Sequence, residues 1–185
     1  MSGMTEPPPK RIYLDANAFI ELIEKNSATT TRLARLFGGW EWQDHLIVTS
    51  EITIAEVLVK PIQIAVETGN YALHDLYQRV LSVQPGVTDL LPITRSTWQR
   101  AALVRAQLKR FADVAVKLPD AVHLAAALDG RCDTFLTNDI RLQSATRALI
   151  ERRGISESDP LPTIKRLVTF DAAELDILAA ELGCP

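Results

Sequence analysis

Short apolar, β-rich runs alternate along this chain with longer segments of helical period, and this alternation constrains the fold more than any other feature. We expect strands at 11–14, 46–49, 90–94, 134–137 and 166–169. Each run is apolar enough to be buried on both faces, which is typical of parallel strands covered by helices. The pattern therefore predicts an α/β fold with a central parallel sheet of about five strands, flanked by helices.

The segments between the strands have helical periodicity. We expect helices near 16–26, 30–38, 51–67, 70–83, 96–112, 120–129, 140–152 and 171–182. Ser50 and Ser96 precede two of these segments as candidate N-caps, and Gly154 follows another as a candidate C-cap. Pro61 is expected to kink or divide the third helix, because proline cannot donate a backbone hydrogen bond.

The chain is expected to form one domain. It has 185 residues, of which 47% are hydrophobic and 23% charged, and no Gly- or Ser-rich linker divides it. Residues 1–10 contain three consecutive prolines and are expected to form a disordered tail before a domain at 11–185. A chain this long can bury roughly 70% of the surface of its unfolded form. A bound metal would therefore serve chemistry rather than hold the fold together.

Cysteine usage and charge limit the classes of protein to which the chain can belong. Cys132 and Cys184 lack CxxC spacing, so free thiols in a reducing compartment are expected. No apolar run approaches the roughly 18 residues of a membrane span, and the N-terminus lacks the pattern of a signal peptide. A cytoplasmic protein is expected. The net charge of −3 argues against binding nucleic acid mainly through a strong positive field.

Two aspartates follow predicted strands. Asp15 comes after the first strand in RIYLDANAFIELI, and Asp139 comes after the fourth in TFLTNDIRL. Open parallel sheets bind ligands at the carboxyl edge, so these carboxylates would approach each other if their strands are neighbours. Asn17 and Thr137 could support such a site by hydrogen bonding. The alternatives are local ones, with Asn17 as a helix cap and Asp139 as the N-cap of the next helix.

Two further acidic residues lie near the starts of predicted helices. Asp120, in KLPDAVHLAAALDG, would lie at the same carboxyl edge of the sheet as the strand ends. Alternatively, an aspartate in a first helical turn can simply interact favourably with the helix dipole. Thr53 and Glu56 have the spacing of a capping box. If Ser50 is the N-cap, however, Glu56 lies almost two turns into its helix and needs another explanation.

Four carboxylates that meet would repel one another. Two of them about 4 Å apart repel by roughly 4 kcal/mol even at an effective dielectric constant of 20. Either some of them protonate or a divalent cation neutralises them, and all-oxygen ligands favour Mg²⁺ or Mn²⁺. A cation held by a cluster of Asp15, Glu56, Asp120 and Asp139 could polarise a phosphodiester and lower the pKa of a bound water.

Four segments in this order, LDANAFIELI, TSEITIAEVL, KLPDAVHLAAAL and DTFLTND, resemble the PIN domain. The resemblance is specifically to VapC-type toxin ribonucleases of type II toxin-antitoxin systems and covers about residues 11–150. It implies strand order 3-2-1-4-5 and Mg²⁺- or Mn²⁺-dependent endonucleolytic cleavage of RNA. Its catalytic and metal-binding acids fall on Asp15, Glu56, Asp120 and Asp139. It also implies a cognate antitoxin that lies across the active-site groove, and a homodimer.

Some features depart from this family or allow other interpretations. The chain is long for the family, with an extended stretch at 61–94 and a further strand and helix at 166–183. A haloacid dehalogenase phosphatase would need an aspartate where Asn17 stands, and a phospho-receiver domain would need adjacent acids near the first strand. A non-catalytic PIN-fold module that binds RNA or protein is the remaining alternative. His45 and His123 have no partner nucleophile in sequence, so structural roles are expected for both.

Overall fold

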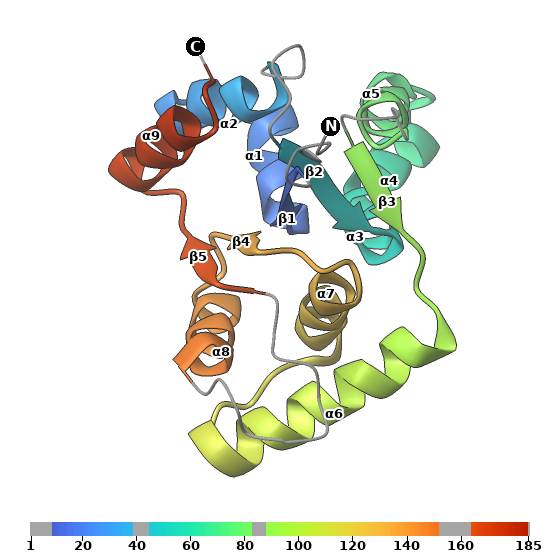
Figure 1. Cartoon of the computed structure of the whole chain (residues 1–185). Helices are drawn as coiled ribbons and strands as arrows, with labels where there is room; N and C mark the ends of the chain where they lie inside the picture. Colours follow the sequence, from blue (N-terminus) through green and yellow to red (C-terminus); the bar gives the residue numbers. More distant parts are fainter. Residues whose placement is uncertain (1–8, 39–44, 83–87, 152–163, 185) are drawn as a thin grey trace, which may run out of the picture.

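The computed structural model describes residues 9–38, 45–82, 88–151 and 164–184. Five parallel strands form one sheet in the order β3-β2-β1-β4-β5, which confirms the predicted fold class and strand order (Figure 1). The strands are β1 Lys10–Leu14, β2 His45–Ser50, β3 Thr88–Leu91, β4 Thr134–Leu136 and β5 Arg166–Val168. β1 therefore begins within the predicted tail, whose residues 1–8 lie outside the described part of the chain.

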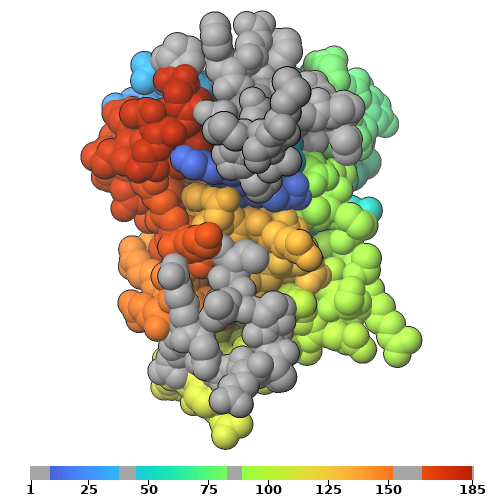
Figure 2. All heavy atoms as spheres, viewed as in Figure 1, coloured from blue at the N-terminus to red at the C-terminus, as the bar shows by residue number. Residues whose placement is uncertain are grey.

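Helices connect the strands and cover both faces of the sheet. They are α1 Ala16–Glu24, α2 Ala28–Gly38, α3 Glu51–Val57, α4 Val59–Thr68, α5 Ala72–Val80, α6 Arg95–Ala112, α7 Leu118–Asp129, α8 Ile140–Glu151 and α9 Ala172–Glu181. Figure 1 shows α1, α2, α5 and α9 on one side of the sheet and α6, α7 and α8 on the other. In the space-filling view of Figure 2, the red α9 lies above the orange α8, and the yellow-green α6 forms the lower right of the surface.

The side chains of β1 alternate between two hydrophobic cores, as expected for a strand buried on both faces. Ile12 and Leu14 pack with α1, α2, α5 and α9, while Tyr13 packs with α6, α7 and α8. All three side chains are fully buried. β1 is therefore the centre of the fold, and its carboxyl end lies between those of β2 and β4.

The predicted third helix is divided, as expected from Pro61. Leu58 is both the C-cap of α3 and the N-cap of α4. Pro61 lies in the first turn of α4, where a backbone N–H would have no partner within the helix. The break ends α3 at Val57, so Glu56 lies in its last turn.

Two helix caps differ from the sequence-based expectations. The prediction of Ser96 as an N-cap was wrong, because α6 begins one residue earlier and Thr94 forms a capping box with Thr97. Ser50 is the N-cap of α3 by position, but its side chain makes no capping hydrogen bond. Gly154 lies outside the described residues. In the part of the chain that the structure describes, no helix is long and apolar enough to cross a membrane.

Candidate active site

Asp15 occupies the turn between β1 and α1 at the carboxyl edge of the sheet. It is the N-cap of α1, and its Oδ1 accepts a hydrogen bond of 3.2 Å from the backbone N–H of Ala18. Its own backbone N–H donates to the carbonyl of Leu136, which ties it to the end of β4. Asp15 is only 1% exposed, so its carboxylate is fixed and largely removed from bulk water.

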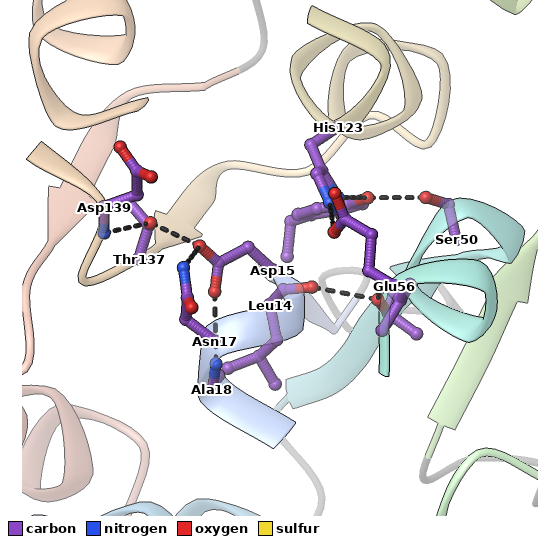
Figure 3. A network of polar contacts seen from close by, with 12 residues as sticks. Leu14, Asp15, Asn17, Ala18, Ser50, Glu56, His123, Thr137 and Asp139 are labelled. Atoms are coloured by element: carbon purple, nitrogen blue, oxygen red, sulfur yellow. Dashed lines mark hydrogen bonds and ion pairs between the residues drawn. The ribbon is translucent and has the colours of Figure 1, made fainter. Parts of the chain in front are cut away.

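The end of β4 brings a second carboxylate close to Asp15. The hydroxyl of Thr137 donates to Asp15 Oδ2 and accepts a hydrogen bond of 3.0 Å from the backbone N–H of Asp139 (Figure 3). Asp139 Oδ1 also accepts from the backbone N–H groups of Arg141 and Leu142 at the start of α8. Asp139 therefore caps α8, as its alternative interpretation proposed, and Thr137 connects its backbone to the carboxylate of Asp15.

Asn17 does not cap α1, because Asp15 takes that position. Asn17 is exposed on the first turn of the helix, and its Nδ2 lies 3.4 Å from Asp15 Oδ2. The capping interpretation of Asn17 was therefore wrong. Its amide is placed to support the carboxylate of Asp15.

Asp120 lies in the first turn of α7, two residues after the helix begins. Its Oδ2 is buried and has no hydrogen-bond partner within the described part of the chain. A buried carboxylate oxygen without a partner is costly, and such oxygens mark places where a cation or an ordered water is expected. This oxygen distinguishes Asp120 from an acid that only stabilises a helix dipole.

Glu56 projects from the last turn of α3 towards α7. Its Oε2 lies 2.8 Å from Nε2 of His123, and its side chain is 35% exposed. The capping-box interpretation of Glu56 was wrong, because α3 begins at Glu51 with Ser50 as its N-cap. Figure 3 shows Glu56 beside His123, with Asp15 lying between this pair and Thr137.

One pocket of about 500 Å³ brings these acidic residues together. It is lined by Asp15, Ala16, Asn17, Ile20, Glu56, Val59, Asp120, His123, Asp139 and Leu142. All four acidic residues proposed from the sequence therefore face a single cavity at the carboxyl ends of β1, β2 and β4. Thr137 is fully buried and contacts two residues that line this cavity, Asp15 and Asp139.

The pocket penalises uncompensated negative charge. Burial raises the pKa of Asp15 above its usual range, although hydrogen bonds from Thr137 and Ala18 oppose the rise. Burial also raises the pKa of Asp120, and the negative charge of Asp139 adds to that effect. Both shifts mean that the pocket holds its carboxylates more readily when protonated or neutralised by a cation.

The donors of the pocket fit a hard divalent cation. Carboxylate oxygens are what Mg²⁺ and Mn²⁺ prefer, and a bound Mg²⁺ commonly uses one or two carboxylates and completes its shell with waters and phosphates. Within the described residues, no group of three or more His, Cys, Asp or Glu side chains is gathered closely enough to hold a metal ion. A cation in this pocket would therefore use one or two carboxylates at a time, with waters and phosphates as its other ligands.

Sequence reasoning missed the part that His123 and Arg141 play around the pocket. His123 was expected to be structural, yet it lines the pocket and contacts Glu56. Its position one helical turn after Asp120 was the available signal, because residues three apart lie on the same helix face. The Arg141 guanidinium lies 4.0 Å from Asp139, and its positive charge opposes the rise in the pKa of Asp120.

Comparisons with known proteins agree with this architecture. The family model of the PIN domain matches residues 12–148. No curated protein matches the chain. A similar solved structure is that of VapBC2 from Rickettsia felis bound to a DNA fragment from their promoter, with a TM-score of 0.58, 15% identity, and 87% of this chain and 99% of that chain covered.

Two further solved structures show a similar fold. DNA-bound VapBC from Salmonella typhimurium has a TM-score of 0.58 at 15% identity and covers 88% of this chain and 99% of that chain. VapC20 from Mycobacterium tuberculosis, a Sarcin-Ricin loop cleaving toxin, has a TM-score of 0.51 at 18% identity, with 80% and 99% covered. At these identities the likeness is one of fold.

Proposed function

We propose, from the premise that this chain belongs to the PIN domain family, that it is a Mg²⁺- or Mn²⁺-dependent endoribonuclease. The observation that carries the proposal is the single pocket lined by Asp15, Glu56, Asp120 and Asp139. The buried Oδ2 of Asp120 in this pocket has no hydrogen-bond partner among the described residues, which favours a cation or an ordered water beside it. The reaction would be hydrolysis of RNA phosphodiester bonds.

Each acidic residue has a proposed part. Asp15, Asp120 and Asp139 would hold one or two cations, while Glu56 would contact a cation through water or position the attacking water. A bound Mg²⁺ or Mn²⁺ supplies Lewis-acid polarisation of the phosphodiester and lowers the pKa of a bound water. The protein supplies a fixed, partly dry carboxylate frame for that chemistry.

The neighbouring residues keep this frame in place. Thr137 and the N–H of Ala18 each hold one oxygen of Asp15, so the carboxylate cannot rotate freely. Asn17 lies beside the same carboxylate. Arg141 lines a smaller pocket that shares Asn17 and Asp139 with the first one, and its exposed guanidinium could donate hydrogen bonds to a phosphate of the substrate.

We further propose that the protein is the toxin of a toxin-antitoxin pair and that it forms a homodimer. The likeness in fold to VapBC proteins from Rickettsia felis and Salmonella typhimurium supports a protein antitoxin as its partner. The alternative is a non-catalytic PIN-fold module that binds RNA or protein. On that alternative, the acidic residues would contribute only to the fold, and neither a metal nor substitution of the pocket acids would change binding.

Cleavage of a mixed pool of structured RNA by the purified protein tests the proposal. Reactions contain EDTA, Mg²⁺ or Mn²⁺, and the wild type is compared with Asp15→Asn and Asp120→Asn. Asp171→Asn is a matched control, because Asp171 follows β5 and caps α9 much as Asp15 follows β1 and caps α1. Asp75→Asn, in the first turn of α5, is the matched control for Asp120.

The proposal predicts metal-dependent cuts by the wild type and both controls, with loss of cutting in Asp15→Asn and Asp120→Asn. Cuts that persist in EDTA, or that survive in Asp15→Asn at the wild-type rate, would contradict it. Binding of the same RNA pool without cleavage in any metal would favour the non-catalytic module.

A further inference from the structure

A chain of four polar side chains runs from the interior of the protein to the acidic pocket. Ser50 Oγ lies 2.6 Å from Tyr13 Oη, and Tyr13 Oη lies 2.9 Å from His123 Nδ1. His123 Nε2 in turn lies 2.8 Å from Glu56 Oε2. These side chains come from β1, the end of β2, the last turn of α3 and α7, so the chain connects four separate elements at the same edge of the sheet (Figure 3).

The inner members of this chain have little freedom to move. Ser50 and Tyr13 are fully buried, and His123 is 2% exposed. The Tyr13 ring stacks on that of Phe135 in β4, with 5.2 Å between the ring centroids and an interplanar angle of 13°. The Tyr13 and His123 rings pack in a T-shaped arrangement, with 5.9 Å between their centroids. Packing therefore holds both rings in the orientation that makes the hydrogen bonds.

The hydroxyl proton of Ser50 determines the direction of the hydrogen bonds. Among the described residues, Tyr13 Oη is the one side-chain partner of Ser50 Oγ, and the Ser50 side chain makes no capping bond. A buried hydroxyl proton needs an acceptor, so Ser50 donates to Tyr13. Tyr13 must then donate its own proton to Nδ1 of His123. The remaining ring proton lies on Nε2, which donates to Glu56.

The opposite direction leaves a buried donor without an acceptor. If His123 Nδ1 carried the proton, it would donate to Tyr13, and Tyr13 would donate to Ser50. The Ser50 hydroxyl proton would then have no acceptor among the described residues. Burial also raises the pKa of Tyr13 well above its ordinary value, so the phenol keeps the proton that this arrangement requires.

We propose that Ser50 and Tyr13 fix His123 as the Nε2–H tautomer, and that this tautomer anchors Glu56 Oε2 and leaves Oε1 free for the pocket. Tyr13 and His123 are thus positioning residues, which act on the reaction through Glu56. The consequence for catalysis rests on the proposed nuclease function. The tautomer itself is a property of the folded chain and does not depend on that function.

The test compares three variants with a matched control. Tyr13→Phe removes the donor to Nδ1 while keeping the ring that stacks on Phe135. His123→Gln retains an N–H donor near the position of Nε2, whereas His123→Asn is too short to reach Glu56. Tyr77→Phe is the control, because it also removes a fully buried tyrosine hydroxyl bonded to a glutamate, Glu24, outside the residues that line the pocket.

The kinetic expectation separates positioning from general destabilisation. Loss of supporting hydrogen bonds around a metal site commonly lowers activity by about 10–100-fold. We expect kcat to fall roughly tenfold in Tyr13→Phe and on the order of 100-fold in His123→Asn, while His123→Gln stays within about tenfold of the wild type. Tyr77→Phe should keep kcat within about twofold. Equal activity of His123→Asn and His123→Gln would overturn the proposal.

Nitrogen NMR of the wild-type protein gives a second readout that needs no substrate. In ¹⁵N-labelled protein, long-range ¹H–¹⁵N spectra should show Nδ1 of His123 as an unprotonated nitrogen and Nε2 as a protonated one. Tyr13→Phe should weaken this preference, whereas Tyr77→Phe should leave it unchanged. A protonated Nδ1 in the wild type would overturn the donor chain. Failure of the wild type to cleave RNA would instead contradict the proposed function, and the spectrum would still decide the tautomer.

Discussion

The hydroxyl of Thr137 donates a hydrogen bond to the buried carboxylate of Asp15, across the adjoining ends of β4 and β1. Burial raises the pKa of Asp15, and this hydrogen bond is the strongest interaction that opposes the rise. A single hydroxyl therefore keeps a nearly inaccessible carboxylate closer to its charged form. That form is the one required to bind a cation.

Replacing Thr137 with valine tests this relationship, because valine has the same shape without the hydroxyl. The change removes a donor to Asp15 and the acceptor for the backbone N–H of Asp139. We expect the free energy of unfolding at pH 7 to fall by about 1.5–3 kcal/mol, the usual range for a hydrogen bond to a charged group. Urea unfolding measures the loss, and ¹³C NMR should show the pKa of Asp15 raised further.

Thr137→Ser is the control for this experiment. Serine keeps the hydroxyl and loses only the methyl group, so the pKa of Asp15 should stay near its wild-type value. If Thr137→Val and Thr137→Ser had the same effect on that pKa, packing of the methyl group would be the important feature and the hydrogen bond would not.

The stability of Asp15→Asn relative to the wild type should depend on pH. Below the ordinary aspartate pKa of 3.8, the residue is protonated in both the folded and the unfolded chain, so its ionisation adds nothing to stability. Above it, the unfolded chain releases the proton first, because the folded pKa is raised. The wild type therefore loses stability as pH rises through this window, and Asp15→Asn does not.

We expect the stability of Asp15→Asn relative to the wild type to rise steadily between pH 3 and pH 7 in EDTA, because the folded pKa of Asp15 is raised. Thermal unfolding of both proteins across this range measures it, and subtracting the two curves cancels the contributions of the other acidic groups. A constant difference across the range would show that burial does not raise the pKa of Asp15. Asp171→Asn is the control for loss of a helix cap, because Asp171 caps α9 but is exposed and lies outside the pocket.

Periodicity predicted the fold because buried parallel strands and amphipathic helices leave strong local patterns. The errors arose where a distant residue decides the local structure. The strand expected at 90–94 lies at Thr88–Leu91. It ends earlier because the backbone N–H of Ile93 donates a hydrogen bond to the carboxylate of Glu51 and Thr94 is the N-cap of α6. No sequence pattern within that segment could have predicted the contact between Ile93 and Glu51, which are 42 residues apart.

The part of the candidate site that could be predicted consists of residues that come directly after strands. Asp15 and Asp139 could be placed because each follows a strand, and parallel strands end at the same edge. The part played by His123 could not be found in this way. It depends on Tyr13, 110 residues away, and on Glu56, 67 residues away. Only the packing of α3 and α7 against the sheet brings these residues together.

Arg141 should contribute to binding RNA more than to the chemical step. Its guanidinium is half-exposed at the rim of the pocket, 4.0 Å from Asp139. We expect Arg141→Gln to raise KM several-fold with a smaller change in kcat, because a phosphate contact outside the reacting centre acts on binding. The slope of log affinity against log salt should also fall by about 0.7 for a single-stranded substrate.

Arg166→Gln is the control for Arg141. Arg166 begins β5 at the opposite edge of the sheet and pairs with Glu181. Its replacement should leave KM and the salt dependence unchanged. If Arg141→Gln kept the wild-type salt slope, the Arg141 guanidinium would have no contact with the RNA backbone.

Removal of the divalent cation should lower the stability of the wild type much more than that of Asp120→Asn. The buried Oδ2 of Asp120 has no partner among the described residues, and the charge of Asp139 raises the pKa of Asp120 further. A cation in the pocket would satisfy this oxygen and cancel the repulsion. A ligand at 100 times its Kd stabilises a protein by about 2.7 kcal/mol, or roughly 5–10 °C in Tm for a chain of this size.

Thermal unfolding with increasing Mn²⁺, each point repeated in EDTA, measures this stabilisation. The wild type and Asp75→Asn should gain Tm as the Mn²⁺ concentration passes the Kd, because neither lacks a pocket carboxylate. Asp120→Asn should start at an equal or higher Tm in EDTA, since it has lost a source of repulsion, and should then gain much less. An equal gain in all three proteins would place the cation outside the pocket formed by Asp15, Glu56, Asp120 and Asp139.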